Sequence, residues 1–263
     1  MHIVVCIKQV PDATNVRIDP NTHTLVRQGV ECIINPFDLF AVEAALKIRD
    51  ECQAKVTVMT MGPPQAEEAL REVLSRGVDD AVLLSDRAFA GSDTWATSVT
   101  LSAAVRKMGD VDLVFCGKQA VDGDTAQVGP EVATILDIPY ATFVKHIERL
   151  EDGCLKVTRQ TDEGTEIWKL PTPALITVLK EVGEPRLPSL RHKMRAKKAP
   201  ISVWGAADLG LNPDDVGLCG SYTQVVRVFS PPRRTDRIMI EGTVEEQVEQ
   251  LYRYLKEAKV PGL

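Results

Sequence analysis

The sequence lacks the cysteine patterns of metal centres and redox dithiols. Its six cysteines lie at least 20 residues apart, and none belongs to a C-x-x-C pair. The common zinc sites and iron–sulfur clusters need closely spaced thiolates, so the spacing excludes their signatures. We therefore interpret the cysteines as small buried residues or free thiols of a reducing compartment.

Long apolar runs and an excess of positive charge are also missing. No window approaches the roughly 18 apolar residues of a membrane-spanning helix. The N-terminus, MHIVVCIKQV, has only a short apolar run and does not resemble a signal peptide. A net charge of −6 disfavours binding to a phosphate backbone. These absences predict a cytoplasmic protein without a transmembrane segment and without a nucleic-acid partner.

Familiar catalytic motifs are absent as well. The sequence contains no G-x-S-x-G, H-E-x-x-H, G-x-G-x-x-G or G-x-x-x-x-G-K-[ST] motif. Its four histidines are scattered in polar surroundings. We therefore expect no catalytic side chain and no metal ligand, and we expect any chemistry to come from a bound cofactor.

What is present is a regular alternation of apolar and amphipathic segments. The apolar, β-branched runs cover residues 3–8, 56–60, 81–85 and 113–117, and the segments with helical spacing cover residues 38–50, 64–76 and 93–108. Nearly continuous apolar character is typical of strands that are covered on both faces. The alternation predicts an α/β fold with a doubly wound, mostly parallel sheet.

The pattern changes in the second half of the chain. From about Val157, the runs VTRQTDEGTEIW and ALITVLK predict antiparallel strands at a sheet edge or in a second small sheet. Residues 184–200 combine three prolines with many Lys and Arg residues, which predicts a linker or an exposed recognition loop. Beyond this segment we expect a strand at residues 222–230 and an amphipathic helix at residues 244–258.

Loops that follow the strands are the expected binding sites, because ligands of open parallel sheets lie at the carboxyl ends of the strands. The first such loop is NPFD, residues 35–38, where Asp38 is expected to cap the next helix. A helix cap without any binding role is an equal alternative. The second loop, Met61-Gly62-Pro63, allows close backbone approach at Gly62.

The third loop, residues 117–130, reads GKQAVDGDTAQVGP and precedes the helical segment EVATILD. It places small residues, hydroxyl groups and amide groups just before a helix N-terminus, where free N–H groups and the helix dipole attract a pyrophosphate. Asp122 and Asp124 are alternatively caps, and no histidine or third carboxylate accompanies them at a metal-binding spacing. This loop is the strongest candidate for a nucleotide site.

The sequence resembles the β subunit of electron-transfer flavoproteins over nearly its whole length. The resemblance depends on IKQVPD, NPFDLFAVEAAL, GKQ…DGDTAQVGP and VTRQTDEGTEIWKLPTPALIT, with slight departures at Glu163 and Trp168. It implies a fold of the adenine-nucleotide α-hydrolase-like type and an obligate heterodimer with a flavin-bearing α subunit. The expected organisation is a nucleotide-binding domain at residues 1–183, and a basic recognition loop with an extended C-terminal arm on the α subunit at residues 184–263.

The resemblance implies one of two cofactors. Ordinary members hold AMP as a structural element, whereas electron-bifurcating members hold FAD, which accepts hydride from NADH. Electrons then pass to ferredoxin or flavodoxin and, through the α-subunit FAD, to an acyl-CoA dehydrogenase or quinone oxidoreductase. The run DGDTAQVGP resembles the bifurcating group, so we expect FAD, with AMP as the alternative in the same site and NAD(H) as a transient substrate. NADH oxidation is expected only in the αβ or a larger complex.

The resemblance also assigns roles to individual residues. Leu190 corresponds to a leucine that anchors the β subunit on a partner dehydrogenase. The expected nucleotide-binding residues are Cys6, Asn35, Pro36, Phe37, Asp38, Met61, Gly62, Asp122, Gly123, Asp124, Thr125, Ala126, Gln127, Val128 and Gly129.

A stand-alone nucleotide-binding protein of the stress-protein type is a further alternative. The basic linker and the amphipathic tail disfavour it, since such a protein needs neither.

Overall fold

The computed structural model describes residues 1–12, 17–18, 25–26, 32–149, 153–227 and 237–260. The chain divides into two compact units, Met1–Arg227 and Val228–Leu263. Among the described residues, no helix has both the length and the apolar character required to cross a bilayer.

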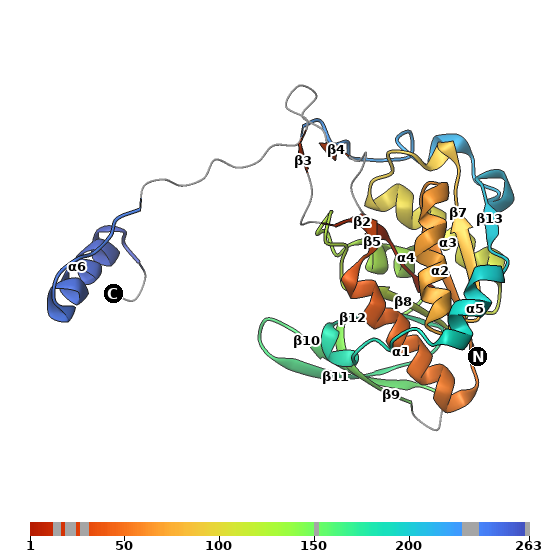
Figure 1. Ribbon diagram of the computed structural model, residues 1–263, viewed down its shortest axis with the longest axis horizontal. Coiled ribbons are helices and arrows are strands. Elements are labelled where there is room, and N and C mark those ends of the chain that lie inside the picture. The colour runs from red at the N-terminus through yellow and green to blue at the C-terminus, as the bar shows by residue number, and fades with distance from the viewer. Residues whose placement is uncertain (13–16, 19–24, 27–31, 150–152, 228–236, 261–263) are drawn as a thin grey trace. The chain divides into compact units, whose positions relative to one another are not determined.

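The first unit is built on a nine-stranded sheet of described residues (Figure 1). Its order is β11-β10-β9-β12-β8-β1-β6-β7-β13. All pairs from β9 to β13 are parallel, whereas β10 is antiparallel to both of its neighbours. The strands are β1 (His2–Cys6), β6 (Lys55–Met61), β7 (Asp80–Leu84), β8 (Leu113–Gly117), β9 (Tyr140–Arg149), β10 (Leu155–Gln160), β11 (Thr165–Leu170), β12 (Ala174–Val178) and β13 (Ser202–Trp204).

Helices connect these strands. They are α1 (Pro36–Cys52), α2 (Glu67–Ser75), α3 (Thr94–Met108), α4 (Val128–Leu136) and α5 (Leu190–Lys198), with the 3₁₀ turns η2 (Pro64–Ala66), η3 (Arg87–Phe89), η4 (Lys180–Val182), η5 (Ala207–Leu209) and η6 (Pro213–Asp215). Two small antiparallel ladders pair β2 (Gln9–Pro11) with β5 (Cys32–Ile34) and β3 (Arg17–Ile18) with β4 (Leu25–Val26).

Side chains alternate along the central strands between two apolar cores. Val5 and Phe115 pack with residues of α1 and α2, whereas Val4 and Cys116 pack with residues of α3 and α4. Because both faces of the sheet are buried, the central strands carry continuous apolar runs. The predicted α/β fold with a mostly parallel sheet is confirmed, as are the four predicted parallel strands and the helices between them.

The later strands differ in part from the prediction. β10 and β11 form the expected antiparallel pair at the edge of the sheet. β12, from the ALITVLK run, is instead a fully buried parallel strand between β8 and β9. β9 was not predicted, because its buried residues follow no regular alternation. Residues 222–227 form no strand, and the rest of that predicted strand lies outside the described residues.

The first unit also extends beyond the predicted boundary at residue 183. α5 packs against α2 and buries Ala196, and β13 pairs with β7. Arg186 contributes to this attachment, because its side chain donates hydrogen bonds to Glu43 at 2.9 and 3.0 Å. The basic segment is therefore attached to the core, with the helix α5 where a linker or loop was predicted.

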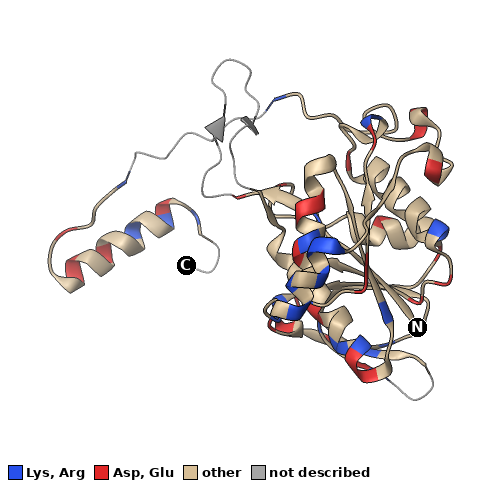
Figure 2. Ribbon diagram, turned by 45° about the vertical axis from the view of Figure 1, so that its right-hand side comes forward, with Lys and Arg blue, Asp and Glu red and all other residues tan. Residues whose placement is uncertain are grey.

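The second unit contains the predicted amphipathic helix, α6 (Val244–Glu257). It begins with a capping box, in which the Thr243 hydroxyl accepts from the Glu246 N–H and the Glu246 carboxylate accepts from the Thr243 N–H. Acidic and basic residues lie along its length (Figure 2). None of its residues is buried.

Candidate functional site

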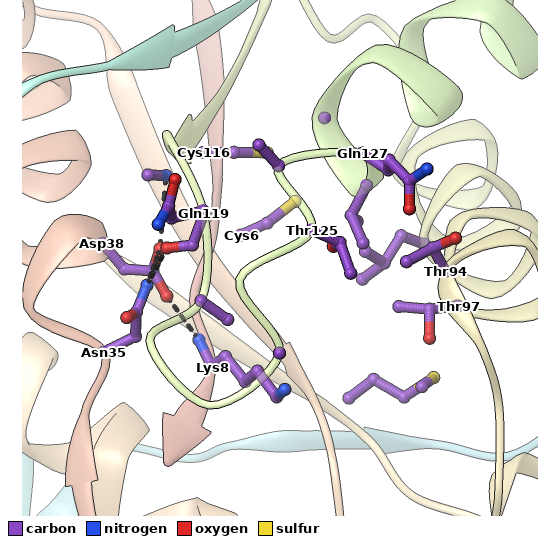
Figure 3. Close-up of a pocket in the computed structure, with 18 of the residues that line it drawn as sticks. Cys6, Lys8, Asn35, Asp38, Thr94, Thr97, Cys116, Gln119, Thr125 and Gln127 are labelled. Carbon is purple, nitrogen blue, oxygen red and sulfur yellow. Dashed lines mark hydrogen bonds between the residues drawn. The ribbon is translucent and has the colours of Figure 1, made fainter. Parts of the chain in front are cut away.

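A cavity of about 450 Å³ lies at the carboxyl ends of the central strands (Figure 3). Cys6 at the end of β1, Met61 at the end of β6 and Cys116 in β8 contribute to its floor. Loop 118–127 and the first residues of α3 and α4 complete its wall. The three loops singled out in the sequence thus meet around one space, as the rule for parallel sheets requires.

Asp38 is a buried carboxylate at the edge of this cavity. Its oxygens accept hydrogen bonds from the Lys8 N–H at 2.7 Å, the Asn35 amide at 2.9 Å and the Gly117 N–H at 3.2 Å. Burial raises the pKa of Asp38 to about 7, although these hydrogen bonds and the charge of Lys8 oppose the rise. Asp38 therefore joins the ends of β1 and β8 to the start of α1.

Asn35 connects this cluster to the third loop. Its amide group donates to the Gln119 carbonyl at 2.8 Å, and its amide oxygen accepts from the Val121 N–H at 3.2 Å. The Lys8 ammonium group adds an ion pair with Asp122 at 2.7 Å. The side chain of Gln119 also donates to Asp124. The loop is thus positioned by the side chains of a distant segment before any ligand arrives.

Two glycines are required by close packing beside the cavity. A Cβ atom at Gly117 would lie 2.6 Å from the carbonyl carbon of Phe37 and 2.8 Å from the Asp38 nitrogen. A Cβ atom at Gly129 would lie 2.5 Å from the Thr177 methyl group. These contacts bring α1 and the start of α4 against the sheet. Gly123 has nothing within 4 Å of such an atom and faces open space.

Hydroxyl and amide side chains gather on the opposite side of the cavity from Asn35 and Asp38 (Figure 3), and the Thr94 hydroxyl there donates to Glu131 at 3.1 Å. Figure 3 shows Thr94 and Thr97 of α3 near Thr125 and Gln127 of the third loop. α3 and α4 both begin here, so the positive dipole ends of two helices border one space. The start of α4 has no side-chain cap, whereas Asp93 caps α3 by accepting from the Ala96 N–H. This donor set suits an anionic ligand such as a phosphate ester.

Cys6 and Cys116 are free thiols that line the cavity as neighbours on β1 and β8. A hydrogen bond with Cys6, together with burial, raises the pKa of the Cys116 thiol well above its ordinary value. A protonated thiol is a poor nucleophile. Cys116 therefore contributes a neutral surface to the floor.

Most of the predicted nucleotide-binding residues line this cavity. They are Cys6, Asn35, Asp38, Met61, Gly123, Thr125, Ala126, Gln127, Val128 and Gly129. The remaining five, Pro36, Phe37, Gly62, Asp122 and Asp124, lie beside it without lining it. The expected helix-capping role of Asp38 is wrong, because α1 begins at Pro36 and Asn35 occupies the N-cap position.

Several lining residues were missed by the sequence analysis. Lys8 and Lys118 bring positive charge to the cavity, and the connection from β7 to α3 contributes a whole wall. The lining residues of that wall are Phe89, Gly91, Ser92, Asp93, Thr94 and Thr97. The sequence did contain a signal for this wall. The connection follows a predicted parallel strand and carries a run of small and polar residues, Gly-Ser-Asp-Thr.

Leu190 lies outside the cavity, at the first position of α5, and 76% of its surface is exposed. Ser189 caps the helix by accepting a hydrogen bond from the His192 N–H at 3.1 Å. Leu187 and Met194 are also exposed nearby in sequence. Leu190 therefore belongs to a small group of exposed apolar side chains. Its expected role as a partner anchor stays a prediction.

The open parallel sheet and the donor-rich cavity at its strand ends define an α/β ligand-binding protein. A model of the electron transfer flavoprotein domain matches residues 22–209. The chain belongs to the electron transfer flavoprotein family. Several of its relatives are named electron transfer flavoprotein subunit beta, and β subunits of this family pair with α subunits.

Three relatives illustrate the similarity. Subunit CarD of the caffeyl-CoA reductase-Etf complex of Acetobacterium woodii is 50% identical, with 99% of this chain and 100% of the relative covered. The electron transfer flavoprotein subunit beta of Thermoanaerobacterium thermosaccharolyticum is 48% identical, with 99% and 100% covered. Protein FixA of Azorhizobium caulinodans is 48% identical, with 90% and 87% covered.

Proposed function

We propose that this chain is the β subunit of an electron-bifurcating flavoprotein and that its cavity binds FAD. The supporting observation is the convergence of two helix N-termini, Thr125, Gln127 and two lysines on one space. A diphosphate ester needs this kind of donor set. The cavity volume of about 450 Å³ lies in the range of about 300–1,000 Å³ typical of ligand sites.

The carboxylates around the cavity already have partners within the chain. Asp93 lines the cavity, and its oxygens accept hydrogen bonds from the Ala96 N–H and from Thr223. The Asp38 oxygens already accept three hydrogen bonds, and Asp122 is paired with Lys8. Gly123 leaves open space beside the third loop, where a ligand longer than AMP would continue. The residues of this chain thus fit a dinucleotide.

When bound, FAD would supply hydride acceptance from NADH and one-electron transfer. The residues of this chain would bind and orient it. Thr125, Gln127 and the start of α4 would hold the phosphates, and the apolar floor at Cys6 and Met61 would exclude water from that side. No side chain of this chain is required to exchange a proton or form a covalent bond.

Two groups of exposed apolar side chains support the proposed partners. The first is the apolar stripe of α6, which contains Val244, Val248 and Leu251, and the second is the group that contains Leu190. We infer that the α subunit covers the apolar stripe of α6, and that Leu190 contacts an acyl-CoA dehydrogenase or quinone oxidoreductase. The name of the relative CarD, which places it in a complex with caffeyl-CoA reductase, favours a partner that acts on an acyl-CoA. Ferredoxin or flavodoxin is the proposed low-potential acceptor. NADH oxidation belongs to the αβ or a larger complex.

Substitution of two donors tests this proposal. Thr125→Phe with Gln127→Phe, in the chain co-purified with its α subunit, should remove one FAD per heterodimer and abolish NADH-dependent ferredoxin reduction. The α-subunit flavin should stay bound. Gln160→Phe, which adds a ring to an exposed position outside the cavity, is the control and should change neither quantity. Full flavin content in the double variant would contradict the proposal.

A further inference from the structure

The connection between β7 and α3, which lines one side of the cavity, also contacts a segment from later in the chain. Residues 216–223, none of which lines the cavity, return from the C-terminal part of the first unit and pack against this wall. The Leu218 N–H donates to the Ala90 carbonyl at 3.0 Å. Gly217 has φ +60°, and a Cβ atom there would lie only 2.0 Å from the Ala88 carbonyl oxygen. The two stretches of backbone are therefore in direct contact.

Asp93 connects the wall, the segment 216–223 and α3. One carboxylate oxygen, Oδ1, accepts from the Ala96 N–H at 3.0 Å and caps α3. The other, Oδ2, accepts from the N–H of Thr223 at 2.9 Å and from its hydroxyl at 3.1 Å. The backbone N–H of Asp93 donates to the Ser221 hydroxyl at 2.8 Å. Asp93 itself lines the cavity.

The contacts of Asp93 favour a charged carboxylate. Burial by itself would raise the pKa of Asp93, but hydrogen bonds from Ala96, Thr223 and Tyr222 hold it below its ordinary value. Hydrogen bonds to a charged acceptor are stronger than neutral ones. The Trp95 and Tyr222 rings add a tilted contact, with centroids 5.8 Å apart. The attachment therefore depends on Asp93 more than on any single neutral contact.

The first turn of α3 is the element that the cavity and the segment share. Thr94 and Thr97 line the cavity within or next to the turn that Asp93 caps. A ligand held by this turn fixes the position of Asp93, and a fixed Asp93 holds Thr223. Loss of the segment would in turn release one of the groups that position the turn.

We propose that Asp93 is a positioning residue that couples occupancy of the cavity to the attachment of residues 216–223. This segment precedes the point at Arg227 where the chain passes into the second unit. The inference rests on the proposed function, because it requires a nucleotide in the cavity. Coupling of this kind is reciprocal, so a nucleotide strengthens the attachment by the same factor by which the attachment strengthens nucleotide binding.

Asp93→Asn separates the two roles of the side chain, which are capping α3 and accepting hydrogen bonds from Thr223. Its amide oxygen can still cap α3, since asparagine is a good N-cap residue. Its amide nitrogen cannot accept from Thr223. Asp86→Asn is a matched control, because Asp86 uses Oδ1 for the Ala88 N–H and Oδ2 for the Ala206 N–H without lining the cavity. Thr223→Ala removes the hydroxyl donor alone and leaves Asp93 in place.

The experiment uses the full chain with its α subunit and measures two quantities. The first is the dissociation constant of FAD, and of AMP, for the nucleotide-depleted heterodimer. The second is amide hydrogen exchange at Leu218 and Thr223 with and without nucleotide. In the wild type, nucleotide should slow this exchange about fivefold or more, the lower end of measured couplings. Asp93→Asn should weaken binding by a similar factor and remove the effect on exchange, and Thr223→Ala should do so to a smaller degree.

The outcomes separate this inference from the proposed function. If the wild type binds nucleotide and Asp93→Asn accelerates exchange at residues 218–223 without changing the dissociation constant, the coupling is overturned and the proposed function stands. If the wild type binds neither FAD nor AMP, both are overturned. An equal loss of affinity in Asp86→Asn would assign the effect to general destabilisation, which also overturns the coupling.

Discussion

The two units of the chain place their apolar side chains in opposite environments. In the first unit, α4 buries Val132 and Ala133 completely against the sheet. In the second unit, α6 has an equally regular apolar stripe, yet 71% of Val244 and 49% of Leu251 are exposed. An exposed stripe of this kind marks an interaction surface. The first unit therefore buries an apolar core of its own, whereas the second leaves its apolar residues exposed, and we propose that a partner covers them.

The largest expected effect concerns the stripe of α6. Leu251→Asp places a charge in the apolar surface, and we expect it to abolish co-purification with the α subunit while the melting temperature of the first unit stays unchanged. Gln250→Asp adds the same charge on a different face of α6 and should leave the heterodimer intact. Size-exclusion chromatography of the co-expressed chains measures both. A stable Leu251→Asp heterodimer would mean that α6 does not need its stripe to be covered by the α subunit.

Expression of this chain without its α subunit is a second test of the difference between the two units. The wild-type chain produced without an α subunit should aggregate or form mixed oligomers, because α6 stays uncovered. Light scattering after purification measures this tendency. A monodisperse monomer with a cooperative melting transition would show that the apolar residues of α6 need no partner to cover them.

The next effect is internal to the first unit. Gly117→Ala forces a methyl group against the backbone at Phe37 and Asp38, and we expect it to destabilise the fold by roughly 3 kcal/mol. Gly123→Ala is the matched control, since its added methyl group meets nothing within 4 Å. Thermal melting of the two variants should show a clear decrease for the first and almost none for the second. Equal decreases would show that the close approach of α1 to β8 is not required.

A smaller effect follows from Asp38. Its pKa rises from 3.8 to about 7 on folding, so its contribution to stability is fully present below pH 3.8 and is lost as the pH rises through 7. Asp38→Asn should therefore flatten the fall in stability between pH 4 and pH 7. Denaturation midpoints at several pH values measure this slope.

Asp86→Asn is the control for this pH dependence. The pKa of Asp86 is lowered by hydrogen bonds from the N–H groups of Ala88 and Ala206. Its contribution is therefore lost only as the pH falls below 3.8, and the slope between pH 4 and pH 7 should match that of the wild type. An unchanged slope in Asp38→Asn would show that Asp38 titrates normally.

The smallest effect concerns the ion pair between Lys8 and Asp122, whose side chains are partly exposed. A double-mutant cycle with Lys8→Met and Asp122→Asn should give a coupling energy below about 1 kcal/mol, as for other exposed pairs. Urea denaturation is the measurement. A coupling of several kcal/mol would mean that this pair, and not Asn35, holds the third loop.

The sequence alone predicted those elements whose structure follows from a single physical rule. Parallel strands buried on both faces carry continuous apolar runs, so β1, β6, β7 and β8 were predictable. The rule that ligands lie at strand ends brought loops 35–38 and 117–130 to one site. α5 was missed because Ala196 is its single buried residue, which leaves no apolar period.

The roles of single polar residues were harder to predict. Asp38 was expected to cap a helix, but its acceptors are occupied by N–H groups of Lys8 and Gly117, which are 30 and 79 positions away. Asp93 likewise bonds to Thr223 across 130 positions. No local pattern encodes such pairs, because they arise only when distant strand ends meet.

The most direct test of the central claim is the nucleotide content of the unmodified heterodimer. The complex is purified with its α subunit, denatured, and its released nucleotides are separated and quantified by chromatography. We predict two FAD per αβ pair, one of them in the cavity of this chain. One FAD and one AMP per pair would contradict this prediction and assign the cavity to a structural nucleotide.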